Sequence, residues 1–116
     1  MQGNNYRPID TFMAHENNII NFYKNLDQNA TNTVYVEGIP IDATEREVSH
    51  IFRPYPGFKG LRLIEKEKNN KKTYICFVDF ENEIQSTICI NTLQGYRFDK
   101  NDLLGLHLSY GVKKNN

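Results

Sequence analysis

Two short segments of this chain carry aromatic rings that alternate with aliphatic residues. In the first, Thr33 to Glu37 (TVYVE), Tyr35 stands between two valines. The second, Thr73 to Phe80 (TYICFVDF), has Ile75 and Phe77 two positions apart. Successive side chains of a β-strand point to opposite faces, so Tyr35, Ile75 and Phe77 are predicted on the face away from the core. Exposed rings of this kind offer flat surfaces on which another flat ring can stack.

Two helices are predicted to support these strands. Thr44 and Glu47 form a T-x-x-E capping box, and the helix that follows ends before Pro54. Asn82, with Gln85 three residues later, forms the cap of a second helix, which ends at the Gln94-Gly95 pair. The apolar residues expected on the buried sides of these helices are Val48, Ile51, Phe52, Ile84 and Ile88, with Cys89 as a further candidate.

Two further strands complete the pattern. Phe58 to Glu65 is predicted as one, followed by a charged loop over Lys66 to Lys72, and Gly105 to Tyr110 as the other. The order predicts an α+β fold, a ferredoxin-like βαββαβ sandwich of a four-stranded antiparallel sheet and two helices. The strand residues expected to point toward the helices are Val34, Val36, Cys76, Val78 and Phe80.

The chain is predicted to divide into four parts. Residues 1–9 are rich in Gly, Asn and Pro and are expected to be a disordered lead-in. Residues 10–31 carry apolar side chains at helical spacing, which predicts an N-terminal amphipathic helix and linker. Residues 32–112 form the βαββαβ domain, and residues 113–116 a Lys/Asn tail.

The composition excludes several classes of protein. Fourteen basic and 14 acidic residues give a formal net charge of +0, so long-range attraction cannot by itself hold a polyanion. Cys76 and Cys89 lie in apolar runs and are expected to be buried, reduced thiols, while His15, His50 and His107 have no second ligand at metal spacing. We therefore expect an intracellular protein, nuclear and/or cytoplasmic, with no cofactor, metal or membrane span.

The two aromatic segments resemble a known pair of signatures. Val34 to Ile39 (VYVEGI) resembles the RNP2 signature of RNA recognition motifs, and Thr73 to Phe80 resembles RNP1, with a helix and a strand correctly placed between them. The resemblance implies that Tyr35 and Phe77 stack bases of single-stranded RNA, at about 1 to 3 kcal/mol per base. The alternative is that both rings pack beneath another element, such as the N-terminal helix.

A narrower resemblance rests on longer stretches. TVYVEGIPIDATEREVSHIFRPYPGFKGLRL, CFVDF and LQGYRFD look like the family named RNA-binding protein with multiple splicing, which includes couch potato and plant relatives. In that family the position of Ile75 is also aliphatic. The resemblance implies a homodimer, with contacts around the first helix of the domain, that recognises short CAC-containing sites in mRNA during post-transcriptional regulation or RNA processing.

Eight residues are candidates for RNA contact: Tyr35, Phe77, Ile75, Glu37, Arg62, Lys72, Ser109 and Lys113. Arg62 either reaches RNA or pairs with Glu37. Lys72 stands one residue before the position where RNP1 usually carries a basic residue. Lys113 follows Val112, where the narrower family usually has a basic residue. Lys66, Lys68, Lys71 and Lys114 either contact phosphates or are solvated surface charges, with Glu65 and Glu67 diluting the first cluster.

Two other functions are weighed against RNA binding. The first is a domain that binds a peptide through its first helix and the Arg97-Phe98 loop, without binding RNA. In proteins of that kind one residue separates the arginine from the phenylalanine, whereas here the two are adjacent. The second is an enzyme of acylphosphatase-like topology, but the sequence carries no phosphate cradle and no nucleophile with a base. We therefore expect no enzymatic activity.

Overall fold

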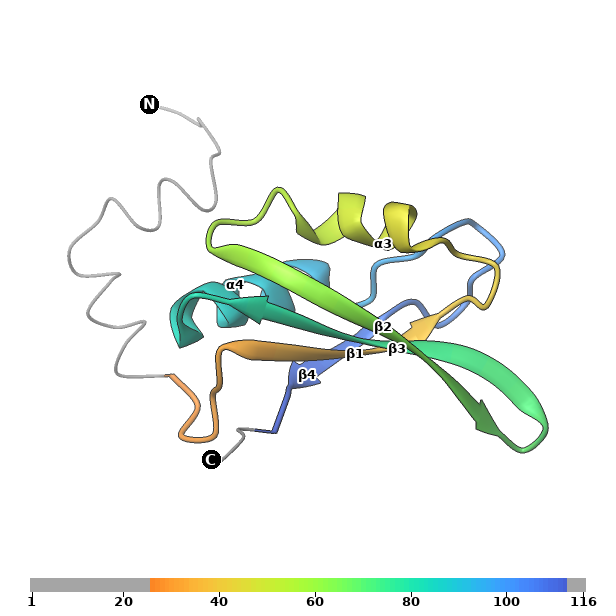
Figure 1. Cartoon of the computed structure of the whole chain (residues 1–116), viewed down its shortest axis with the longest axis horizontal. Coiled ribbons are helices and arrows are strands. Elements are labelled where there is room, and N and C mark those ends of the chain that lie inside the picture. Colours follow the sequence, from red (N-terminus) through yellow and green to blue (C-terminus); the bar gives the residue numbers. More distant parts are fainter. Residues whose placement is uncertain (1–25, 113–116) are drawn as a thin grey trace, which may run out of the picture.

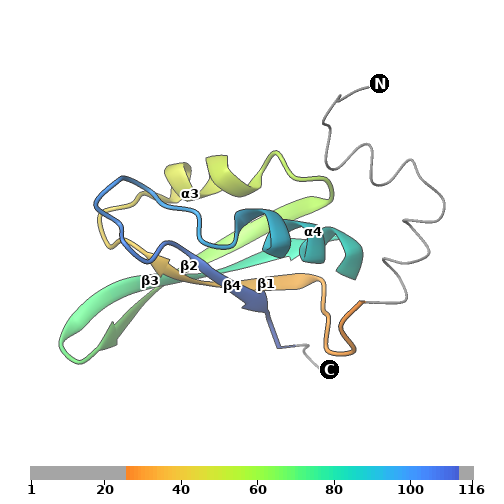
Figure 2. The same ribbon diagram turned by 180° about the vertical axis from the view of Figure 1, so that it is seen from behind.

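Four strands and two helices make up residues 26–112, the part of the chain that this computed structural model describes (Figure 1). Along the chain the elements are β1 (Thr33–Ile39), α3 (Glu45–Phe52), β2 (Phe58–Lys68), β3 (Lys71–Phe80), α4 (Glu83–Leu93) and β4 (His107–Tyr110). The strands form one antiparallel sheet in the order β2-β3-β1-β4. Figures 1 and 2 show both helices on the same side of this sheet. The predicted βαββαβ fold is therefore confirmed.

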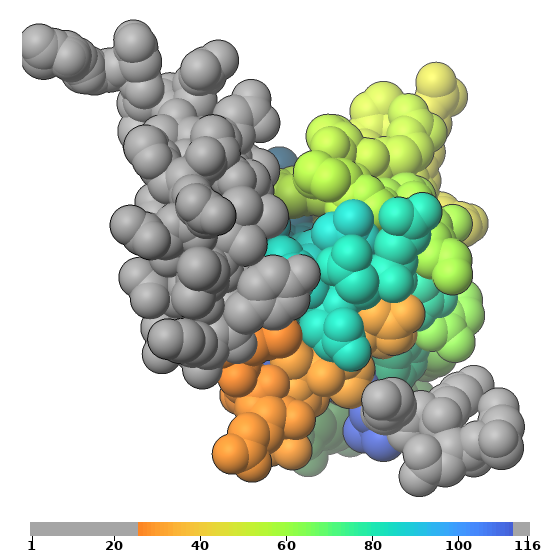
Figure 3. All heavy atoms as spheres, turned by 90° about the vertical axis from the view of Figure 1, so that its left-hand side faces the viewer, coloured from red at the N-terminus to blue at the C-terminus, as the bar shows by residue number. Residues whose placement is uncertain are grey.

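The N-terminal predictions fall almost wholly outside the described residues. The lead-in, most of the predicted first helix, and the tail that contains Lys113 lie outside them. Residues 26–31 are described and form a turn, in which Asp27 accepts hydrogen bonds from the backbone N–H groups of Asn29 and Ala30. Thr31 and Ser86 then tie this turn to the domain, because the Ser86 hydroxyl donates to the Thr31 carbonyl. Figure 3 shows the turn against the start of α4.

Both helices begin with the predicted capping boxes. At α3 the Thr44 hydroxyl accepts from the Glu47 N–H at 3.1 Å, and the Glu47 carboxylate accepts from the Thr44 N–H at 2.9 Å. Asn82 and Gln85 make the same reciprocal pair at α4. Each cap satisfies two backbone donors that the first helical turn leaves free, and a cap residue of this type contributes about 1 kcal/mol.

The core lies between the sheet and the helices. The five strand residues predicted to point inward are all 0% exposed: Val34, Val36, Cys76, Val78 and Phe80. Val48 and Phe52 are buried from α3 as expected, with Ile51 half-buried beside them. The prediction for α4 is wrong in part, because Ile84 and Ile88 are only half-buried. The apolar residues that α4 buries are Cys89, Ile90 and Leu93. Apolar residues occur on all sides of α4, so their spacing could not identify its buried face.

The segment predicted as a charged loop is instead a β-hairpin. Strands β2 and β3 stay paired as far as Lys68 and Lys71, and only Asn69 and Asn70 connect them. These two asparagines have φ values of 55° and 62°, as a two-residue type I′ turn requires. The outer part of this β2–β3 hairpin extends beyond the rest of the sheet (Figure 1), and its residues from Ile64 to Lys72 are all exposed. It therefore lacks the apolar alternation by which a half-buried strand is recognised.

The last strand is shorter than predicted and lies beside the end of α4. The Gln94 side chain accepts a hydrogen bond from the Leu108 N–H and donates one to the Leu108 carbonyl, both at 2.8 Å. Gly105, just before β4, has a φ of 74°, and a Cβ there would lie 2.4 Å from the Gly95 carbonyl oxygen. Only glycine fits this crossing, and its left-handed backbone conformation keeps Gly105 out of the strand, which begins at His107.

Candidate nucleic-acid interface

One row of side chains crosses the sheet on the face away from the helices. Arg62 of β2 lies opposite Phe77 of β3, Phe77 opposite Tyr35 of β1, and Tyr35 opposite Ser109 of β4. Residues directly opposite in an antiparallel sheet share a face, so these four side chains stand side by side. We call Arg62, Phe77, Tyr35 and Ser109 the cross-sheet row. It brings together four of the eight candidate residues.

Tyr35 and Phe77 form a pair of rings at the centre of the row. Their centroids are 5.3 Å apart and their planes are inclined by 48°. Both side chains are half-buried, with one side open to solvent. No helix lies over this face among residues 26–112, so the alternative of packing beneath another element has no support from the described part of the chain.

Arg62 lies over the Phe77 ring, with its guanidinium carbon 5.2 Å from the ring centroid. It also pairs with the Asp79 carboxylate at 3.5 Å, and Asp79 accepts a further hydrogen bond from Thr33 at 2.7 Å. The predicted alternative, a pair with Glu37, is wrong because β3 separates β2 from β1. Arg62 therefore stands at one end of the row as a partly exposed cation.

Glu37 lies next to the row and is held by two neighbours. The Tyr35 hydroxyl donates to the Glu37 carboxylate at 3.0 Å, and His107 Nδ1 lies 3.8 Å from its other oxygen. Partial burial and this hydrogen bond raise the pKa of Tyr35, so the hydroxyl remains a donor at neutral pH. From the sequence we concluded only that His107 has no second ligand at metal spacing, and it was not a candidate for RNA contact. Its position two residues before Ser109 in β4 was the signal that it shares this face.

Ile75 is the sixth candidate on this face, after the four of the row and Glu37, although its side chain is only 9% exposed. It lies opposite Ile64 of β2, which is 43% exposed and was not a candidate. Together they form a small apolar floor beside the aromatic pair. The aliphatic residue in the RNP1 segment therefore offers little surface of its own.

Lys72 is not brought to this face. Alternation along β3 puts it on the same side as Tyr74 and Cys76, opposite to Phe77. Its amine pairs with the Glu65 carboxylate at 3.4 Å. The sequence showed a lysine one residue early in the RNP1 segment, and a shift of one residue moves a strand side chain to the other face.

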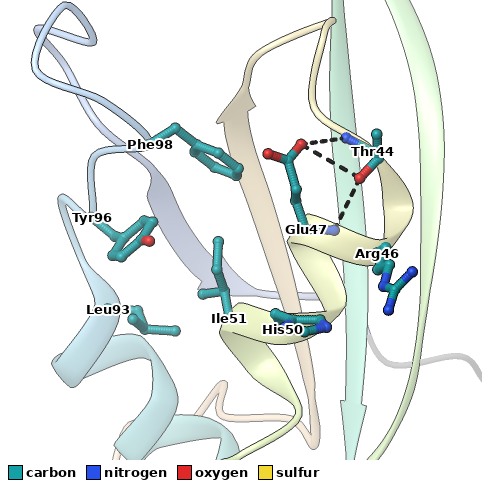
Figure 4. Close-up of a pocket in the computed structure, with 8 residues that line it drawn as sticks. All are labelled: Thr44, Arg46, Glu47, His50, Ile51, Leu93, Tyr96 and Phe98. Carbon is teal, nitrogen blue, oxygen red and sulfur yellow. Dashed lines mark hydrogen bonds between the residues drawn. The ribbon is translucent and has the colours of Figure 1, made fainter.

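A hollow of about 520 Å³ lies on the helix side of the molecule (Figure 4). It is lined by Thr44, Arg46, Glu47, His50, Ile51, Leu93, Tyr96 and Phe98. The peptide-binding alternative would need Arg97 to reach a ligand here. Arg97 instead donates hydrogen bonds to the carbonyls of Lys100 and Asp102, at 2.8 and 2.7 Å. Its guanidinium shapes its own loop, so this geometry does not favour the peptide-binding function.

The two cysteines are free and buried, as predicted. Burial raises the pKa of each thiol to about 12, so neither is a nucleophile at neutral pH. Within residues 26–112 no three His, Cys, Asp or Glu side chains come close enough to hold a metal ion. No helix of that part of the chain has the length and apolar character to cross a membrane.

Comparisons with known proteins agree with this geometry. Residues 34–104 match the family described as RNA recognition motif. Nuclear speckle RNA-binding protein A of Arabidopsis thaliana is 44% identical over 82 residues, which is 68% of this chain and 35% of that protein. RNA-binding protein with multiple splicing 2 of Xenopus laevis is 35% identical over 78 residues, covering 67% of this chain and 38% of that protein. The chain thus spans little more than a third of either relative, and the predicted narrower family is the more distant of the two.

Among solved structures, the C-terminal RRM domain of MEC-8 bound to AGCACA is similar to this fold. Its TM-score is 0.59 at 25% identity, and the match covers 75% of this chain and 98% of that domain. The shared sheet and helices extend over nearly all of the solved domain. The similarity therefore concerns the whole βαββαβ unit and not one motif.

Proposed function

The chain belongs to the RNA recognition motif family, and we propose that its cross-sheet row binds single-stranded RNA. The observation that carries this proposal is the pair of rings of Tyr35 and Phe77, each with one side open to solvent. The pair lies at the centre of a sheet face that no helix of residues 26–112 covers. The family consists of binding domains, not of enzymes, which excludes the acylphosphatase-like alternative for residues 34–104. RNA binding through stacking also agrees with a net charge of +0, because stacking needs no excess of positive charge.

Stacking on Phe77 requires Arg62 to move. The guanidinium lies over the ring that a base would cover, 5.2 Å from the centroid, and is held there by Asp79. An exposed ion pair and a cation–π contact together stabilise this position by about 1 to 2 kcal/mol. A stacked base repays that loss, and the released guanidinium becomes a donor for an RNA phosphate or base edge. Arg62 thus covers the empty ring and contacts RNA when a base arrives.

The preference for CAC is proposed from two sources of support. The resemblance to the RNA-binding protein with multiple splicing family implies it, and the MEC-8 domain was solved with AGCACA, which contains CAC. The polar groups beside the row suit this sequence. A carboxylate accepts from the amino group of cytosine, and Glu37 is oriented for that by the Tyr35 hydroxyl. His107 and Ser109 on β4 add further polar groups at the same edge.

A nuclear role in RNA processing is proposed from the plant relative, whose name states that it is a nuclear speckle RNA-binding protein. This supports only the nuclear part of the expected location. The homodimer implied by the narrower family also remains a proposal. Contacts around α3 would be compatible with RNA binding, because α3 lies on the opposite side of the sheet from the cross-sheet row (Figure 2).

Selection of bound RNAs from a random pool tests this function. We expect single-stranded sequences that contain CAC to be enriched, and the enriched RNA to lose affinity when the cytosine that pairs with Glu37, one of the two, is replaced by uracil. Uracil has a carbonyl in place of the 4-amino group of cytosine, so it lacks the donor of the hydrogen bond that the Glu37 carboxylate would accept. Enrichment without any common sequence would refute the CAC preference. A failure to enrich any RNA would refute the function itself.

A further inference from the structure

The β2–β3 hairpin continues the sheet face beyond the cross-sheet row. In its register Lys66 lies opposite Thr73, and Lys68 lies opposite Lys71. Residues two apart along a strand share a face, as do residues directly opposite each other. Lys66 and Lys68 are therefore on the same face as Arg62, and Lys71 joins them from β3. We call Lys66, Lys68 and Lys71 the lysine track.

The acidic residues of the hairpin lie on its other face. Glu67 is opposite Lys72, and Glu65 is two residues away from Glu67 along β2. Lys72 pairs with Glu65 on that face at 3.4 Å. Along the sequence these glutamates alternate with the lysines and dilute their charge. In the folded hairpin the charges separate, so one face carries three lysines and the other carries both glutamates.

We propose that the lysine track binds the phosphates of nucleotides that flank those stacked on the cross-sheet row. This inference rests on the proposed function, because the track is useful only if RNA already lies on the sheet. At about 3.4 Å per residue, the six steps along the strand from Arg62 to Lys68 extend the face by about 20 Å. Lysine amines on flexible stems attract phosphates without selecting bases. The track therefore adds affinity for flanking RNA of any sequence.

Charge and position both favour RNA as the occupant. The track is continuous with the cross-sheet row, and its side chains are exposed. Within residues 26–112 the structure records ion pairs for Arg62, Lys72 and His107, and none for the three lysines of the track. The competing explanation is that these lysines only keep the hairpin soluble and prevent strands from pairing at its edge. That explanation predicts no dependence of affinity on RNA length.

The test compares a core RNA of five nucleotides around CAC with the same RNA extended by six uridines at one end or the other. Each RNA carries a fluorescent label, and its fluorescence anisotropy gives the affinity of the protein for that RNA at several salt concentrations. For the intact chain we expect extension at one of the two ends to tighten binding. The variant Lys66→Gln/Lys68→Gln/Lys71→Gln should lose this gain and still bind the core RNA within about twofold.

The size of the effect follows from counterion release. Each phosphate contact with single-stranded RNA contributes about 0.7 to the slope of log affinity against log salt, so three contacts contribute about 2. Relative to 1 M salt, each contact is then worth about fivefold at 0.1 M, and the triple variant should lose about a hundredfold for the extended RNA. Lys71→Gln should lose about fivefold by the same calculation. Lys72→Gln removes the same charge from the neighbouring residue on the opposite face, and should lose less than about twofold.

Three results would overturn the lysine track: no gain from either extension, a gain that the triple variant keeps, or equal losses for Lys71→Gln and Lys72→Gln. The core RNA separates this outcome from a failure of the proposed function. If the intact chain binds the core RNA and extension adds nothing, only the track is refuted. If the core RNA is not bound at all, both proposals are refuted. Unchanged thermal unfolding of the lysine variants excludes loss of the fold as a cause.

Discussion

Removing the Phe77 ring should weaken RNA binding much more than it weakens the fold. In the folded protein the ring meets Tyr35 at 5.3 Å and Arg62 at 5.2 Å, both on the outer face of the sheet. An aromatic pair contributes about 0.5 to 1.5 kcal/mol and a cation–π contact at an exposed site about 0.5 to 1 kcal/mol. Phe77→Ala should therefore lower the free energy of unfolding by about 1 to 2.5 kcal/mol. By contrast, Phe80→Ala, which removes a core ring that is 0% exposed, should lower the free energy of unfolding by about 3 to 5 kcal/mol.

The loss of RNA affinity follows from one stacked base. At about 1 to 3 kcal/mol per base, Phe77→Ala should raise the dissociation constant by about 5- to 150-fold. Removing Tyr35 as well should raise it by about 30-fold or more, although the two losses need not add because the rings touch. Anisotropy titration of a labelled CAC-containing RNA measures these changes, and urea unfolding of the same samples measures stability.

Tyr96→Ala is the matched control for this prediction. Tyr96 is also a partly exposed ring, but it lines the hollow beside α3 on the other side of the molecule (Figure 4). Its removal should leave RNA affinity unchanged within about twofold. If the Tyr35 and Phe77 double variant stays folded and binds RNA as tightly as the intact chain, stacking on the cross-sheet row is refuted. Equal losses for Tyr96→Ala and Phe77→Ala would refute the assignment of the sheet face.

Three more predictions concern the fold and its assembly. Asn69→Val should lower the free energy of unfolding by about 1 to 2 kcal/mol in urea titration, because a φ of 55° is unfavourable for a branched side chain; an unchanged value would contradict the type I′ turn. Cys76 and Cys89 should not react with a thiol reagent at pH 8 until the protein unfolds, since their pKa of about 12 keeps them protonated. Reaction in the native state would show that the two thiols are accessible. Because their pKa is above the ordinary value of 9.0, the two protonated thiols favour the folded state at all pH values below 9, and the free energy of unfolding falls as pH rises from 9 toward 12. Light scattering should give about twice 13.6 kDa if the proposed homodimer forms, and a mass of 13.6 kDa at every concentration would exclude it.

The sequence predicted the parts of the fold that local rules control. Strand alternation identified which residues of β1 and β3 face the core, and the two capping boxes located the starts of α3 and α4. Each of these features depends on residues within a few positions of one another. The ring pair of Tyr35 and Phe77 was predictable for the same reason, because both belong to short signatures whose facing is determined by alternation.

The features that the sequence did not predict depend on contacts between distant segments. The partner of Arg62 is Asp79 and not Glu37, because the strand order puts β3 next to β2. The lysines and glutamates of β2 separate onto two faces because the segment is a strand and not a loop, and the hairpin register then adds Lys71 to the lysine face. Asparagine tolerates the positive φ that a two-residue hairpin turn needs, but the charged residues around Asn69-Asn70 favoured a loop. The sequence could not show which side of α4 is buried, because the apolar residues of that helix occur on all its sides.

The Gln94 side chain makes with Leu108 the two hydrogen bonds that a neighbouring strand would make there. Strand β4 is one edge of the sheet, and an open edge is where a second chain can add a strand and begin an aggregate. With both backbone groups of Leu108 already satisfied, β4 cannot accept such a strand at its centre. At the other edge, the hairpin part of β2 is protected by its charges. The molecule is therefore open to a ligand that stacks on its face, and closed at the centre of β4 to one that pairs with that edge.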